Sequence, residues 1–120
     1  MNRVVFRAWH YNRKQMYGVV LIDFDTGKVV LKEGVIHFGE SVGMVELMQF
    51  SGKTDTLGKM IFEGDVCMYK GKRGIVIKDK DRWSLQYKEA LMEQELPLPM
   101  ISGKDLKVIG NTWEGAEEEE

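Results

Sequence analysis

The chain contains very little of several residue types, and each shortage excludes a class of protein. Its 120 residues include one cysteine, Cys67, so an internal disulfide framework is excluded and a reducing compartment is expected. No apolar run approaches the roughly 18 residues that a membrane-spanning helix needs. Charged side chains within residues 1–7 argue against a secretion signal. We therefore expect a cytoplasmic protein that does not bind a membrane.

Side chains that commonly carry catalytic chemistry are also scarce. The two histidines, His10 and His37, stand alone in the sequence, without the further ligands that a zinc or iron site requires. We expect His10 at an edge or turn and His37 on a strand facing solvent. Cys67 lies within an apolar run, so we expect a buried and inert thiol. The sequence thus predicts no catalytic residue, no metal, no cofactor and no evident small-molecule substrate.

Glycines and short polar residues punctuate the chain at turns. Glu63 and Asp65 flank Gly64 and form the one close carboxylate pair in a motif-like setting. Such a pair can act as acid and base when the two environments differ, and this alternative remains open. The simpler interpretation is structural, because Asp and Asn accept bonds from backbone amides and glycine adopts positive φ. The expected turn residues are Asp55, Gly58, Glu63, Gly64, Asp65, Gly110 and Asn111.

Charge is distributed unevenly along the chain. Five of the 19 acidic residues fall in residues 114–120, whereas all 17 basic residues precede them. We expect residues 116–120 to form a disordered acidic tail. Residues 52–82 contain slightly more basic than acidic side chains, and aromatic residues lie close to them in the sequence. Single-stranded nucleic acid is bound by this combination, through attraction to its phosphates and stacking of its bases. The candidate contacts with nucleic acid or another anion are Lys70, Lys72, Arg73, Lys78, Lys80 and Arg82.

Short apolar runs separated by turn residues predict a mainly β, β-rich α+β fold. The clearest hairpin joins residues 16–24 to 28–32 through Asp25-Thr26-Gly27, where Asp25 can bond backbone amides two residues on. Residues 39–50 are ambiguous between helix and strand. Lys88–Leu96 contains strong helix formers and ends at Pro97, so we expect one short helix there. Residues 106–113 are expected to form the last strand. The aromatic residues expected mainly in the core are Phe6, Trp9, Tyr17, Phe24, Phe50, Phe62 and Trp113.

Four blocks of residues, in order, resemble the YopX family of small bacteriophage and prophage proteins. They are Phe6–Trp9, Lys14–Tyr17, the central run from Met48 to Val66, and Val108–Glu114. The resemblance implies one YopX-like domain over residues 1–115. Its N-terminal β region, residues 1–50, would pack as a hairpin region on an SH3-like small barrel formed by residues 51–115.

The resemblance implies no known biochemical activity. We expect a non-enzymatic accessory protein of a bacterial host's phage or prophage, acting by protein–protein interaction or self-association. The alternative is a nucleic-acid-binding module that uses the basic region of residues 70–82.

Overall fold

The computed structural model describes residues 5–116 and shows a mainly β protein built from two antiparallel sheets. The chain divides into two compact units after Gln49. No helix among the described residues is long and apolar enough to cross a membrane. The predicted acidic tail lies outside the described residues except for Ala116, which belongs to the last strand.

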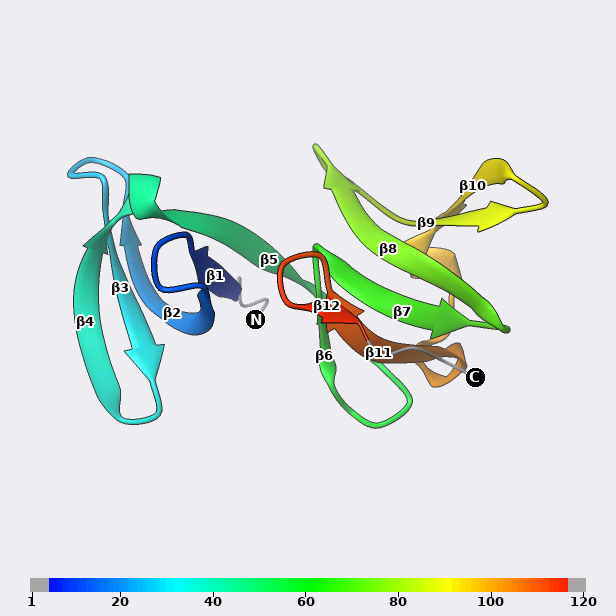
Figure 1. Ribbon diagram of the computed structural model, residues 1–120, viewed down its shortest axis with the longest axis horizontal. Helices are drawn as coiled ribbons and strands as arrows, with labels where there is room; N and C mark the ends of the chain where they lie inside the picture. Colours follow the sequence, from blue (N-terminus) through cyan, green and yellow to red (C-terminus); the bar gives the residue numbers. More distant parts are fainter. Residues whose placement is uncertain (1–4, 117–120) are drawn as a thin grey trace. The chain divides into compact units, whose positions relative to one another are not determined.

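Unit 1 contains five strands in the order β4-β3-β2-β1-β5, in which β1 to β4 form a meander and β5 pairs with β1 (Figure 1). Its elements are β1 Phe6–His10, β2 Gln15–Asp23, β3 Lys28–Glu33, β4 Ile36–Ser41, the 3-10 turn η1 Val42–Met44 and the first part of β5 Val45–Thr54. The predicted hairpin is confirmed as β2–β3. Asp23, rather than Asp25, stabilises its turn, because the Asp23 Oδ1 accepts the backbone N–H groups of Asp25 and Thr26 at 3.0 and 3.3 Å.

The core of unit 1 lies on one face of this sheet. Ala8, Tyr17, Val29, Leu31 and Val45 are buried there. The Tyr17 ring packs edge-on against Phe38, with 5.1 Å between ring centroids. The alternation of buried and exposed residues along β3 is the period-two pattern of a sheet with one covered face.

Unit 2 contains the second half of β5, which pairs with β6, and a six-stranded sheet in the order β10-β9-β8-β7-β11-β12. Its elements are β6 Met60–Phe62, β7 Asp65–Tyr69, β8 Lys72–Asp79, β9 Arg82–Glu89, β10 Met92–Pro97, η2 Leu98–Met100, η3 Gly103–Asp105, β11 Leu106–Asn111 and β12 Gly115–Ala116. The core side chains are Ile61, Cys67, Val76, Leu85, Leu98, Ile101, Leu106 and Val108. Over residues 5–116 neither sheet closes into a barrel, so the SH3-like barrel is not confirmed.

The predicted helix over Lys88–Leu96 is wrong. The segment is a hairpin in which β10 pairs with β9, from Met92 opposite Glu89 to Pro97 opposite Ser84. Ala90 and Leu91 form its turn with φ of 52° and 68°. Pairing with a neighbouring strand outweighs the helix propensity of this segment, which is worth only tenths of a kcal/mol per residue.

Two of the aromatic residues expected in the core lie at the surface. Phe24 is 76% exposed at the tip of the β2–β3 hairpin, and Trp113 is 39% exposed in the β11–β12 turn. Trp9 and Tyr17 are buried. Residues 39–50, which were ambiguous, form the end of β4, the turn η1 and the start of β5.

Candidate binding surfaces

Asp55 links the loop after β5 to strand β11. Its Oδ1 accepts the backbone N–H groups of Leu57 and Lys59 at 2.9 and 2.8 Å, and its Oδ2 accepts that of Val108 at 2.9 Å. Burial of the carboxyl favours its neutral form, but these three hydrogen bonds outweigh burial and lower the pKa of Asp55. Both oxygens are therefore engaged in holding the backbone.

The turn at Glu63-Gly64-Asp65 connects three strands of unit 2. The fully buried Asp65 accepts the Phe62 N–H at 2.8 Å. Gly64, with φ of 86°, donates its N–H to Val76 in β8 and accepts the Thr112 N–H after β11, at 2.8 and 2.9 Å. Hydrogen bonds thus connect this turn to β8 and to the chain after β11.

Asn111 organises the turn between β11 and β12. Its Oδ1 accepts the backbone N–H groups of Trp113 and Glu114, at 2.9 and 2.8 Å, and its Nδ2 donates to Glu114 Oε1 at 2.9 Å. At Gly110 the register with β7 shifts, and a Cβ would lie 2.1 Å from the Gly115 carbonyl oxygen. Glycine is required there by the close approach of β12.

The Cys67 thiol is fully buried in the core of unit 2. Burial, with the nearby Asp65 charge, raises its pKa to about 12. The thiol therefore stays protonated near neutral pH, whereas a nucleophilic cysteine needs the thiolate.

His10 is buried at the end of β1, which pairs with β2 on one side and β5 on the other, so the expected edge or turn position is wrong. Its Nδ1 accepts the Arg13 backbone N–H at 3.1 Å, and its Nε2 lies 2.8 Å from Glu40 Oε2. Because Nδ1 is an acceptor, a neutral His10 carries its proton on Nε2 and donates it to Glu40. This hydrogen bond, with a second one from the Ser41 N–H, lowers the pKa of Glu40.

His37 is exposed on β4, as expected. Within residues 5–116 no three His, Cys, Asp or Glu side chains converge as metal ligands would.

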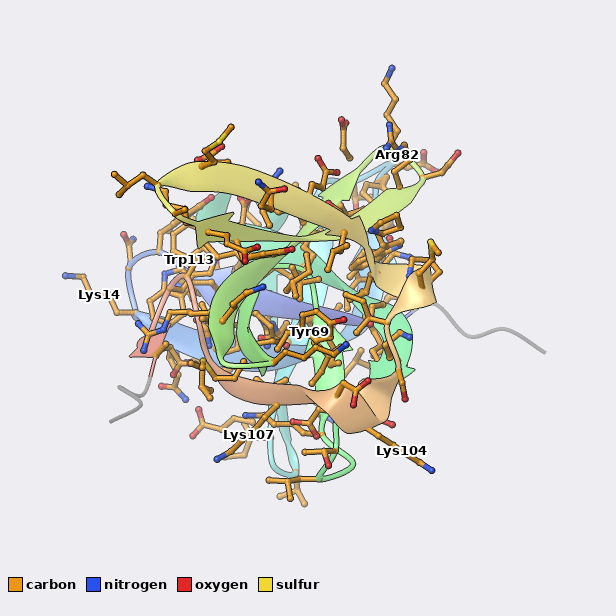
Figure 2. All side chains as sticks on the ribbon, turned by 90° about the vertical axis from the view of Figure 1, so that its right-hand side faces the viewer. Lys14, Tyr69, Arg82, Lys104, Lys107 and Trp113 are labelled. Atoms are coloured by element: carbon orange, nitrogen blue, oxygen red, sulfur yellow. The ribbon has the colours of Figure 1, made fainter. Side chains whose placement is uncertain are left out.

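The six candidate cations fall into two groups at opposite ends of β8. Lys70, Lys72 and Arg73 lie at the β7–β8 turn, and Lys78, Lys80 and Arg82 lie at the β8–β9 turn. The eight residues of β8 span about 25 Å at the rise of a strand. In Figure 2 the labelled Arg82 lies well away from Tyr69, which precedes the first turn.

Aromatic and acidic side chains accompany the first group of cations. Lys72 Nζ lies 3.2 Å from Glu89 and 5.3 Å from the Tyr87 ring centroid. Lys70 Nζ lies 5.4 Å from the Tyr69 ring centroid. This end of unit 2 therefore combines cations with aromatic faces, although Glu89 offsets one of the charges.

A groove of about 740 Å³ borders this group. Its lining includes apolar Val66 and Ile75 and the charged residues Lys72, Arg73, Lys88 and Glu93. The lining comes from β7 to β12 and from the turns beside them. Sequence reasoning identified Lys72 and Arg73 as candidate cations and Asn111 as a turn residue. It missed the other lining residues, because only the order of strands in the sheet brings them together.

Unit 1 has an open strand edge at β4. One side of β4 pairs with β3 along its whole length. Its other side has no backbone hydrogen bond to any described residue. Sequence reasoning could identify residues 36–41 as part of a chain of strands but could not show that they end the sheet.

Comparison with known proteins places the chain in a family. The family model for YopX protein matches residues 5–118. The chain belongs to the YopX family. The crystal structure of protein EF1440 from Enterococcus faecalis has a similar fold, with a TM-score of 0.56 and 21% identity over 95% of this chain and 96% of that chain. No curated protein matches the chain.

Membership of the YopX family confirms the resemblance carried by the four sequence blocks. Two of these blocks contain turn residues described above, namely Asp55, Asp65 and Asn111. The hydrogen bonds of these three side chains hold strands in place. Among the described residues, the β4 edge, the groove and the two groups of cations are candidate binding surfaces.

Proposed function

We propose that this YopX-family chain is a non-enzymatic accessory protein of a phage or prophage that acts in the host cytoplasm by protein–protein interaction or self-association. The observation that supports this proposal is the open edge of β4. An unpaired strand edge offers a row of backbone donors and acceptors, and another polypeptide can add a strand to it.

Two further observations favour binding over catalysis. The oxygens of Asp55 are engaged by backbone N–H groups, which leaves this carboxylate committed to the fold. The thiol of Cys67, with its pKa raised to about 12, is a poor nucleophile.

The alternative is a nucleic-acid-binding module, and the pairing of cations with Tyr69 and Tyr87 favours it. Two features weigh against it. The cations lie at two ends of β8, and Lys72 has an acidic neighbour in Glu89. A strand of nucleic acid would need a more continuous row of positive charge along its phosphates.

The experiment compares the two functions on the same protein samples. Wild-type protein, Gly39→Pro and Gly39→Ala are immobilised and exposed to a bacterial lysate and, separately, to free wild-type protein. We expect a polypeptide, either a host protein or the chain itself, to be retained by wild type and Gly39→Ala and lost with Gly39→Pro. Proline removes a backbone donor from the open edge, whereas alanine keeps it.

The same samples are titrated against single- and double-stranded DNA and RNA at low and moderate salt. We expect no salt-dependent binding. Micromolar binding that disappears in a Lys72→Glu, Arg73→Glu variant, with no retained polypeptide that depends on Gly39, would instead establish the nucleic-acid function.

A further inference from the structure

The hydrogen-bond phase of the β3–β4 ladder determines which groups face the open edge. The Val42 N–H donates to the Gly27 carbonyl at 2.8 Å, one step beyond the pair Lys28–Ser41. In an antiparallel ladder, hydrogen-bonded pairs alternate along the strand. Even-numbered residues of β4 therefore direct their backbone groups toward β3, and odd-numbered residues direct theirs outward.

Three consecutive odd positions of β4 consequently present an N–H and a carbonyl to the open edge. They are His37, Gly39 and Ser41. The Ser41 N–H also donates to the carboxylate of Glu40 at 3.2 Å. The backbone N–H and carbonyl groups of His37 and Gly39 have no backbone hydrogen bond to any described residue.

The β4 edge also lacks the features that normally prevent strands from pairing. Edges are commonly protected by charged side chains and proline. In unit 2, the edge strand β10 carries Glu93, Glu95 and Pro97. In β4 the only charged residue is Glu40, and its carboxylate is held by His10 at 2.8 Å.

We propose that a second copy of this chain pairs with β4 in antiparallel orientation, about a two-fold axis at Gly39. This inference rests on the proposed function and specifies its partner. A two-fold axis makes the interface self-complementary, so that each outward group of one copy meets the same set of groups on the other. The two Gly39 residues exchange both of their hydrogen bonds, and His37 of each copy pairs with Ser41 of the other.

The side chains select this register over its neighbours. An axis at Glu40 would place two glutamates directly opposite each other, which is unfavourable. An axis at Phe38 would pair Ser41 with Val35, which lies in the β3–β4 turn outside the strand. The axis at Gly39 uses only residues of β4. A Cβ at Gly39 would meet no atom within 4 Å, so alanine is tolerated at this position in the monomer.

The first test is the mass in solution, measured by light scattering over a range of concentrations. We expect wild type and Gly39→Ala to approach twice the 13.8 kDa of the chain at high micromolar concentration. We expect Gly39→Pro to raise the dissociation constant at least about tenfold, because it removes both central hydrogen bonds. Proline is compatible with the monomer, since the Gly39 N–H points away from β3. Circular dichroism verifies that the variant is folded.

The second test is the register, measured by disulfide formation between single introduced cysteines. Gly39→Cys should form a covalent dimer under mild oxidation. Val35→Cys is the matched control, because Val35 is 97% exposed and lies four residues away. With the axis at Gly39, the two residues 35 are about 27 Å apart at the rise of a strand, which is too far for a disulfide.

The outcomes separate this inference from the proposed function. A wild-type monomer at every concentration overturns the inference, and so does a dimer that Gly39→Pro leaves intact. If the monomer still retains a host protein in a manner that depends on Gly39, the proposed function stands with another partner. If neither is observed, both fail.

Discussion

Replacement of Asp55 by alanine should destabilise the protein strongly, because its carboxylate accepts three backbone N–H groups. Leu57 and Lys59 are exposed, so water can replace the carboxylate there, at about 0.5–1 kcal/mol for each bond. Val108 is buried, and its N–H would be left without a partner, at about 1–3 kcal/mol. We therefore expect the free energy of unfolding to fall by about 2–5 kcal/mol.

Asp55→Asn should have a smaller effect than Asp55→Ala. Its remaining oxygen can still accept the N–H groups of Leu57 and Lys59, but its NH₂ group would face the Val108 N–H. Urea unfolding followed by tryptophan fluorescence measures both variants. Asp25→Ala is the control, since Asp25 is exposed and should change stability by less than about 0.5 kcal/mol. A loss below about 1 kcal/mol in Asp55→Ala would refute the role assigned to the carboxylate.

The pH dependence of the same variants gives an independent check. The pKa of Asp55 in the folded protein lies below its ordinary value of 3.8. The ionised Asp55 carboxylate therefore contributes to the free energy of unfolding above pH 3.8, and this contribution is lost as the pH falls through the pKa of the folded protein. Asp55→Asn should lose less stability than wild type over this acid range, and an identical pH profile would contradict the depressed pKa.

Three other predictions concern a turn and a buried thiol in unit 2 and a carboxylate in unit 1. Ala90→Asn with Leu91→Gly should raise the free energy of unfolding by about 1 kcal/mol, since both residues have positive φ; no rise in thermal stability would contradict this. Cys67 should not react with a thiol reagent at neutral pH until urea unfolds unit 2, because burial raises its pKa to about 12; rapid native labelling would contradict it. Glu40, whose pKa His10 lowers, should stabilise unit 1 above pH 4.5 and lose that effect as the pH falls through the folded pKa. Glu40→Gln should flatten this part of the stability profile, and an unchanged slope would show that the bond to His10 is not formed.

The sequence predicted correctly those parts of the fold that depend on residues close together in the chain. The β2–β3 hairpin follows from two β-rich runs around a turn ending in Gly27, whose φ is 70°. The predicted short helix failed because Lys88–Leu96 is stabilised as a strand pair by β9, a partner that propensity does not include. The turn at Ala90-Leu91 also contains neither glycine nor asparagine, so no turn signal marked it.

The candidate site was predictable only in part, for reasons of topology. The cations from Lys70 to Arg82 are close in sequence, but the intervening strand β8 separates them into two groups. The groove and the open edge depend on the order of strands in each sheet. The edge position of β4 could not be read from Ile36–Ser41, because an inner strand can carry the same residues.

The most direct measurement of strand addition at β4 is hydrogen exchange of the Gly39 amide at increasing protein concentration. We expect its protection to rise with concentration, because the outward N–H becomes hydrogen-bonded only in the dimer. The Phe38 amide, which points toward β3, should be protected at every concentration and is the internal reference. Exchange of the Gly39 amide that stays fast at all concentrations would contradict pairing of two copies through β4.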